Sequence, residues 1–324
     1  MSAEAPAPFP GSPAGRDRWI LERRGSRNPI DARRAVASFV ELEPGEDGWP
    51  EPVAAIFLAN RECPWRCLMC DLWKNTLEES APPGAIPAQI RGALAALPDA
   101  RRVKLYNSGS FFDPRAIPPE DYPEIAGAVS GFDRVIVESH PALVGEACLR
   151  FRDLLSGGLE VAMGLETIHP EVLPLLNKRM SLAQFEEAAS FLRREGIALR
   201  VFVLLGLPFL SEPESLDWAC RSVEFAFDRG AAAVSIIPTR PGNGALEALG
   251  RRGEFHKPRI ASLEEAVEAS LLLRRGRVFA DPWGLEEFRR CEACFGRRRE
   301  RLQAMNLHQT VAPAVSCAAC GGES

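Results

Sequence analysis

Long apolar runs are missing from this chain. The longest, from Val201 to Leu210, is too short to span a bilayer and contains a glycine and a proline. The opening Met1 to Pro6 lacks the basic start and apolar core of a signal peptide. We therefore expect neither a membrane partner nor export. The 324 residues are 46% hydrophobic and 26% charged, so the composition is that of a globular protein with one large barrel core or two smaller domains.

The chain also lacks an excess of positive charge. Its formal net charge of −5 argues against indiscriminate nucleic-acid binding and leaves room only for a local basic surface. Nine cysteines, seven of them in metal-like spacings, would be hazardous in an oxidising compartment. We therefore expect a cytoplasmic protein. We find no internal repeat.

Cysteines in a short loop are the most informative feature that is present. Cys63, Cys67 and Cys70 have the spacing C-x3-C-x2-C. Structural zinc and electron-transfer clusters usually have four protein ligands, whereas three thiolates leave one metal position open for a substrate or cofactor. The loop follows the apolar run 53–59, which is typical of a buried parallel strand, and barrel enzymes carry their active sites at the carboxyl ends of such strands. A disulfide cluster or part of a zinc site is the alternative.

This motif after a first strand resembles the signature of the radical S-adenosylmethionine (SAM) enzymes. The resemblance implies that Cys63, Cys67 and Cys70 hold a [4Fe-4S] cluster, whose open iron chelates the amino and carboxylate groups of SAM. It also implies that an external electron donor reduces the cluster. Reductive cleavage of SAM then forms a 5′-deoxyadenosyl radical, which takes a hydrogen atom from the substrate.

Strand and helix patterns alternate through the middle of the chain. Strand-like runs are predicted at 53–59, 102–107, 134–139, 159–166, 198–204 and 233–238, and helices near 87–97, 121–130, 145–155, 182–195 and 214–230. Right-handed crossovers would curl such a parallel sheet into a partial (β/α)6 TIM-like barrel of the α/β class. Beyond it we expect a helix near 262–275 and a short strand at 277–281.

Three regions are expected on this basis. Residues 1–50 form a basic N-terminal accessory segment, of which about the first 15 are rich in Ala, Pro and Gly and expected to be disordered. Residues 51–245 form the radical SAM core. Residues 246–324 form a C-terminal extension with a four-cysteine metal site.

Polar residues follow the predicted strands at the ends where a barrel enzyme holds its cofactor. We expect cofactor-binding roles for five residues: Asn107, Ser108, Glu138, Ser139 and Glu166. Carboxylates suit the vicinal hydroxyls of a sugar and an ammonium group. The alternatives are a plain turn for Asn107 and Ser108, and an ion pair or substrate contact for the two glutamates. His140 and His169 each precede a proline and are interpreted as loop-shaping, and we assign no catalytic residue.

A closer resemblance covers about residues 20 to 310. The segments 106–114, 137–141, 164–167, 176–180 and 207–212 resemble those of the group that contains the radical SAM subunit of archaeosine synthase, with the elongator-type radical SAM proteins more distant. The resemblance implies a tRNA or nucleobase substrate, in which a lysine-adducted 7-deazaguanine loses its side chain to leave a formamidine through carbon–nitrogen cleavage. It also implies a partner subunit.

A second cysteine set lies in the C-terminal tail. Cys291 and Cys294 form one C-x2-C pair and Cys317 and Cys320 another, which together indicate a four-thiolate metal site. Zinc, an auxiliary [4Fe-4S] cluster, and unliganded or disulfide cysteines remain open. Cys148 and Cys220 are interpreted as packing residues.

Arginines around the tail cysteines suggest contact with RNA phosphates. They are Arg289, Arg290, Arg297, Arg298, Arg299 and Arg301. The rival function is therefore an RNA-binding iron–sulfur or zinc protein without radical catalysis. SAM cleavage to 5′-deoxyadenosine by the reduced protein would separate the two hypotheses.

Overall fold

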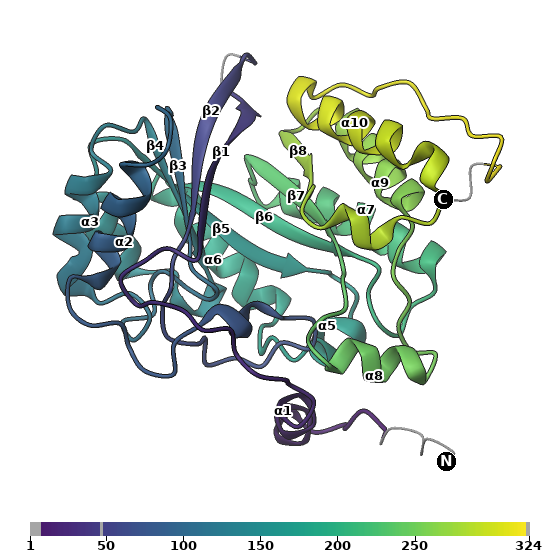
Figure 1. Ribbon diagram of the computed structural model, residues 1–324, viewed down its shortest axis with the longest axis horizontal. Coiled ribbons are helices and arrows are strands. Elements are labelled where there is room, and N and C mark those ends of the chain that lie inside the picture. Colours follow the sequence, from purple (N-terminus) through teal and green to yellow (C-terminus); the bar gives the residue numbers. More distant parts are fainter. Residues whose placement is uncertain (1–7, 46–47, 322–324) are drawn as a thin grey trace.

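The computed structural model describes residues 8–45 and 48–321 and contains one curved eight-stranded sheet (Figure 1). The strands follow chain order from β1 to β8. They are β1 (Ala37–Pro44), β2 (Pro50–Phe57), β3 (Arg102–Tyr106), β4 (Arg134–Ser139), β5 (Gly158–Glu166), β6 (Ala198–Leu205), β7 (Ala233–Pro238) and β8 (Arg277–Ala280). Every neighbouring pair from β2 to β8 is parallel, and β1 pairs antiparallel with β2.

Helices occupy the connections between parallel strands, as right-handed crossovers require. They are α2 (Ala85–Leu94), α3 (Tyr122–Ala128), α4 (Glu146–Arg152), α5 (Val172–Leu175), α6 (Leu182–Arg194), α7 (Glu212–Asp228), α8 (Ala245–Arg251) and α9 (Ile260–Leu272), with α1 (Pro13–Leu21) before the sheet and α10 (Glu292–His308) after it. Figure 1 shows α2 and α3 at one side of the curved sheet and α9 and α10 at the other. The predicted α/β partial barrel is confirmed.

The main hydrophobic core lies between the outer face of the sheet and these helices. Alternate strand residues such as Val103, Leu105, Val201 and Val203 belong to this core and are fully buried. Helix α6 shows why the packing is specific: Ser181 accepts a hydrogen bond from the backbone of the first turn, and the apolar stripe at 185, 188, 189 and 192 is buried.

The inner face of the sheet carries charge instead of apolar side chains near the amino ends of the strands. Arg200 is 1% exposed and donates to both carboxylate oxygens of Glu43 at 2.9 and 2.8 Å and to Glu160 at 2.7 Å. Lys104 reaches the carboxylates of Glu41 and Glu43. Burial alone would raise the pKa of Glu43, but the neighbouring charges of Arg200 and Lys104 hold it well below its ordinary value. A buried ionic floor therefore closes this end of the barrel.

Two strands lie beyond the six that the alternating pattern predicts. Strand β8 corresponds to the short run expected at 277–281, whereas β1 was not predicted as a strand. Its inward residues include Glu41 and Glu43, whose partners Lys104 and Arg200 stand far away in the sequence. The pairing of these charges cannot be seen from neighbouring residues in the sequence. The sequence of β1 therefore resembles that of an exposed polar segment. No described helix is long and apolar enough to cross a bilayer.

Candidate active site and tail metal centre

The three loop cysteines lie just beyond the end of β2, in a segment fixed by two distant side chains and one backbone hydrogen bond. Asn177 donates to the Arg66 carbonyl at 2.7 Å, and Asn243 donates to the Leu68 carbonyl at 2.5 Å. The Leu68 amide donates to the Leu176 carbonyl at 2.8 Å. Irregular backbone is thereby held in one geometry without regular secondary structure, as a metal-binding loop requires.

All three thiols are free, half-buried and electrostatically coupled to one another. Burial raises the pKa of each of Cys63, Cys67 and Cys70 to about 12, and the Lys178 ammonium lowers that of Cys63 and Cys67 only in part. The thiolate forms would therefore need a soft cation to stabilise them. Gly109 packs against the loop, since a Cβ there would lie 3.3 Å from the Cys63 Cβ. Three thiols beside one another fit the cluster that the motif implies.

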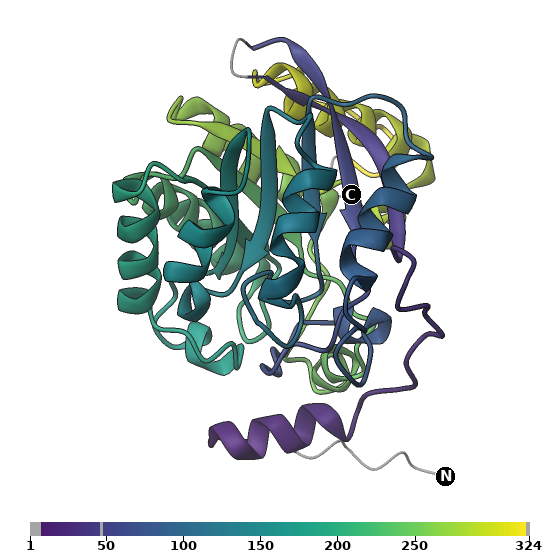
Figure 2. The same cartoon turned by 90° about the vertical axis from the view of Figure 1, so that its left-hand side faces the viewer.

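Helix α1 and the segment after it support the loop from below (Figures 1 and 2). Trp19 and Ile20 share a small buried core with Leu68 of the loop and with Leu246 and Leu249 of α8. Helix α1, which lies in the predicted N-terminal accessory segment, is thus anchored to the cysteine loop and to α8.

Arginines after α1 hold an acidic residue of the same loop. Arg24 and Arg27 contact the two carboxylate oxygens of Glu62 at 2.6 and 2.5 Å. The first seven residues of the segment expected to be disordered lie outside the described residues, and α1 begins within its remainder at Pro13.

Glu138 and Asn107 stand at the ends of neighbouring strands. Burial raises the pKa of Glu138 to about 8, which Lys178 and a backbone hydrogen bond from Asn107 offset in part. The Asn107 side chain is 1% exposed, and neither its amide nitrogen nor its oxygen has a partner among the described residues. Such buried amides are rare because each missing hydrogen bond costs about 1–3 kcal/mol. The arrangement fits a bound group that offers both a donor and an acceptor.

Glu166 forms a buried ion pair with Lys178 at 2.5 Å. A register shift between Gly164 and Glu166, together with φ of +65° at Glu166, turns its side chain out of the regular strand pattern. Gly164 leaves room for this pair, because a Cβ there would overlap both the Glu166 carboxylate and the Lys178 ammonium and one of the two side chains would have to shift. The ion-pair alternative for Glu166 is therefore present, with a lysine as partner.

Ser108, Ser139 and His140 shape the loops beside these groups. Ser108 is half-buried with φ of +36°, and the Ser139 hydroxyl donates to the His140 carbonyl at 3.1 Å. The His140 ring stacks on Trp65 of the cysteine loop with ring centroids 3.8 Å apart. Its Nδ1 accepts from the Ala142 amide, so Nε2 carries the proton toward the Lys178 carbonyl. Burial and Lys178 lower the pKa of His140 to about 3, which keeps the ring neutral.

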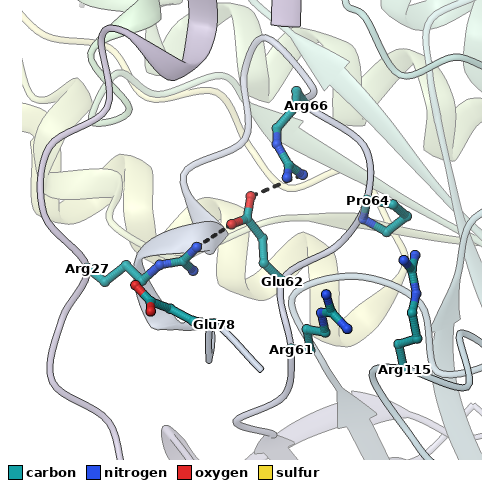
Figure 3. A pocket seen from close by; sticks show the side chains of 7 residues that line it. All are labelled: Arg27, Arg61, Glu62, Pro64, Arg66, Glu78 and Arg115. Carbon is teal, nitrogen blue, oxygen red and sulfur yellow. Dashed lines mark hydrogen bonds and ion pairs between the residues drawn. The ribbon is translucent and has the colours of Figure 1, made fainter. Parts of the chain in front are cut away.

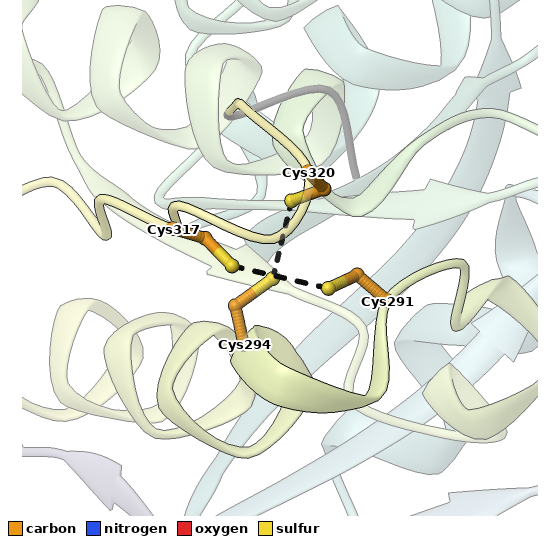
Figure 4. Close-up of side chains that lie close together, drawn as sticks. All are labelled: Cys291, Cys294, Cys317 and Cys320. Atoms are coloured by element: carbon orange, nitrogen blue, oxygen red, sulfur yellow. Dashed lines mark hydrogen bonds between the residues drawn. The ribbon is translucent and has the colours of Figure 1, made fainter.

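The four tail cysteines converge on one point (Figure 4). Their sulfur atoms all lie within 4.8 Å of one another, with Cys291 to Cys317 at 3.9 Å and Cys294 to Cys320 at 3.8 Å. A tetrahedral ion with bonds of about 2.3 Å to sulfur requires separations of about 3.8 Å. Among the described residues, Cys63, Cys67 and Cys70 do not form so compact a set. The two cysteine sites therefore differ in size.

Two of the six tail arginines are unavailable to RNA. Arg298 and Arg301 are buried against Glu264 of α9, and Arg301 also donates to the carbonyls of Ala312 and Pro313. They pin α10 and the following segment to the barrel. The other four are exposed: Arg289, Arg290, Arg297 and Arg299. Of the two isolated cysteines, Cys148 is fully buried and Cys220 half-buried.

Sequence reasoning missed three residues that organise the site. Lys178 is the buried cation that acts on Glu138, Glu166 and two of the thiols, and Asn177 and Asn243 tie the cysteine loop. Asn177 has φ of +57°, which asparagine tolerates better than most residues. Only the resemblance of the segment 176–180 pointed to this region, because the contacts that tie the cysteine loop join residues more than 100 positions apart.

The chain is similar in sequence to archaeal proteins, but no protein-family model matches it. Archaeosine synthase subunit beta of Methanosarcina acetivorans is 28% identical over 276 residues, which cover 78% of this chain and 77% of that protein. Archaeosine synthase subunit beta of Thermococcus kodakarensis is 29% identical over 190 residues, covering 56% and 58%.

Solved structures share the fold. Methylornithine synthase, a radical SAM protein, superimposes with a TM-score of 0.50 at 14% identity and covers 94% of this chain and 88% of its own. The Elp3 protein of Methanocaldococcus infernus has a TM-score of 0.48 at 18% identity, and the chain spans about half its length, with coverage of 60% and 51%. The chain is therefore similar in sequence to proteins named archaeosine synthase subunit beta and shares the fold of methylornithine synthase.

Proposed function

We propose that the chain is a radical SAM enzyme that holds a [4Fe-4S] cluster through Cys63, Cys67 and Cys70. Similarity to radical SAM proteins supports this cluster and SAM as cofactors. The observation that carries the proposal is the cysteine loop, in which three free thiols are fixed beside the Lys178 ammonium. When bound, the cluster and SAM would supply a 5′-deoxyadenosyl radical through reductive cleavage.

The methionyl end of SAM offers the pairing that the buried Asn107 amide lacks. Its ammonium can donate to the amide oxygen, and its carboxylate can accept from the amide nitrogen. Glu138 would lose its proton on meeting a positively charged ligand, because an opposite charge lowers a carboxyl pKa. Ser108 and Ser139 flank these two residues, and Glu166 with Lys178 would bind the ribose or the carboxylate.

An apolar patch suits the adenine ring. Leu204 and Leu207 lie at the end of β6 and pack with Val172 and Leu176. Gly206 between them has φ of +81° and closely approaches Pro258, so this turn excludes larger residues. Free backbone groups beside an apolar wall are typical of adenine sites.

We infer a single metal ion, zinc, at the tail cysteines. A cubane cluster places each thiolate on a different iron, so its ligand sulfurs stand farther apart than those around one ion. The compact sulfur set supports one tetrahedral ion, and zinc is the common occupant of four-thiolate structural sites. The ion would fasten the segment 309–321 to the first turn of α10.

A modified nucleobase or tRNA is the substrate that we propose, with loss of a side chain by carbon–nitrogen cleavage. The support is the similarity to proteins named archaeosine synthase subunit beta, a name that also suggests a partner subunit. Anaerobic incubation with SAM, a reductant and bulk tRNA of the host, followed by nucleoside mass spectrometry, tests the proposal. We expect 5′-deoxyadenosine and one altered nucleoside to form together. Formation of neither product by cluster-loaded protein would refute it.

A further inference from the structure

A pocket of about 430 Å³ borders the cysteine loop and takes no part in the proposed SAM site. Its charged lining consists of four arginines and two glutamates, shown in Figure 3: Arg27, Arg61, Arg66, Arg115, Glu62 and Glu78. Arg61, Glu62 and Arg66 are interleaved with Cys63 along the chain, yet none of the three cysteines lines the pocket. The cysteine loop itself therefore forms a wall between the pocket and the cluster site.

Internal pairing leaves two of these arginines available. Glu62 is already contacted by Arg24, Arg27 and Arg66 at 2.6, 2.5 and 3.2 Å. Arg61 makes no side-chain hydrogen bond or ion pair within 8–45 and 48–321. Arg115 is 55% exposed, and its Nε lies 3.4 Å from Asp113. The pocket thus presents positive charge that the protein does not neutralise.

The chemistry of the lining selects the class of ligand. Guanidinium groups recognise carboxylates and phosphates. The two glutamates in the wall would repel a continuous polyphosphate backbone. They are compatible with a protein surface on which acidic side chains alternate with other groups. The chain as a whole has a net charge of −5, which would repel an acidic protein from most of the surface. The positive pocket would attract the acidic protein and so orient it.

We propose that this pocket docks an acidic patch of the protein that delivers the electron to the cluster. The inference rests on the proposed function, which requires an external donor. A partner seated here would be separated from the cluster by the cysteine loop and would leave the SAM side free. The step is one of electron transfer: a reduced flavoprotein donor gives up one electron and the oxidised cluster accepts it, with no bond made or broken.

The test uses the full chain, an acidic flavodoxin as donor and two readouts. Binding is measured by titration calorimetry, and electron transfer by stopped-flow absorbance of the flavin. Arg61→Glu combined with Arg115→Glu should weaken binding and slow reduction at least tenfold, while reduction by dithionite stays unchanged. Glu78→Gln should change both quantities in the opposite direction, because it removes a negative charge from the pocket. Added salt should reduce the wild-type rate more than that of the double variant.

Matched controls make the outcome decisive. Arg194→Glu reverses an exposed charge at the end of α6 and should leave donor binding at the wild-type level. Arg115→Glu alone changes an exposed side chain and keeps the test usable if the double variant folds poorly. Wild-type binding and rates in the Arg61 and Arg115 variants would overturn the proposal, as would loss of tRNA binding in them with donor binding intact. Because calorimetry needs no cluster, failure of the proposed radical chemistry would be seen separately, as absent SAM cleavage with donor binding retained.

Discussion

The Lys178 ammonium lies 2.5 Å from a Glu166 carboxylate oxygen, in space that a Cβ at position 164 would partly fill. Lys178 also acts on the thiols of Cys63 and Cys67 and on Glu138. One buried cation therefore connects the cysteine loop with the carboxylates at the ends of β4 and β5.

Gly164→Ala should disturb the Glu166 and Lys178 pair without touching the cysteines. The added Cβ would overlap both side chains, so one of them must move. We expect SAM affinity to fall about tenfold, or about 1.4 kcal/mol, with the iron content unchanged. Gly127→Ala in α3 is the control, because a Cβ there meets nothing within 4 Å. Equal SAM affinity in both variants, measured by equilibrium dialysis, would count against a role for the pair.

Replacing Cys63, Cys67 and Cys70 together with alanine should abolish the oxygen-sensitive cluster and SAM cleavage. Each thiolate supplies a soft ligand that alanine lacks. The tail metal should stay, because its four cysteines form a separate compact set. Iron and zinc analysis with an assay for 5′-deoxyadenosine measures both effects. Full SAM cleavage by the triple variant would exclude the radical SAM assignment of this loop.

Glu138 should make stability depend on pH. Burial raises its pKa to about 8, from a usual value of 4.5. Between these values the folded state binds a proton that the unfolded chain has lost, so the free energy of unfolding falls as pH rises through the window. Glu138→Gln removes this effect and should gain up to about 1.4 kcal/mol per pH unit relative to wild type. Urea unfolding of cluster-free protein at pH 6 and 8 tests this, and parallel profiles would contradict it.

Local pattern predicted the parallel strands well because each is rich in buried apolar residues. The predicted run at 134–139 coincides with β4, and that at 198–204 differs from β6 by one residue. The cysteine spacing likewise pointed to the loop. Sequence could not reveal Asn243 or Lys178 as parts of the site, because their roles come from backbone and charges brought together by folding. Strand β1 was missed for the same reason.

Arg200→Met should destabilise the barrel strongly. The change leaves Glu43 and Glu160 buried without the guanidinium that pairs with both. Removing one partner of a buried pair typically costs about 3–5 kcal/mol. Urea unfolding at neutral pH measures the loss, and Arg194→Met, an exposed residue of α6, should change stability by less than about 0.5 kcal/mol. A small loss at Arg200 would mean that water or other cations reach the floor of the barrel.

Cys317→Ala with Cys320→Ala should remove about one zinc per chain and retain both the iron of the loop cluster and SAM cleavage. The expected structural effect is local. Helix α10 stays docked through Arg298 and Arg301 on Glu264, whereas the segment 309–321 loses its metal anchor. Hydrogen exchange should therefore rise in that segment more than in α10. If the tail positions RNA, affinity for tRNA should fall. About eight irons per chain in wild type, with two clusters in the Mössbauer spectrum, would replace zinc with an auxiliary cluster.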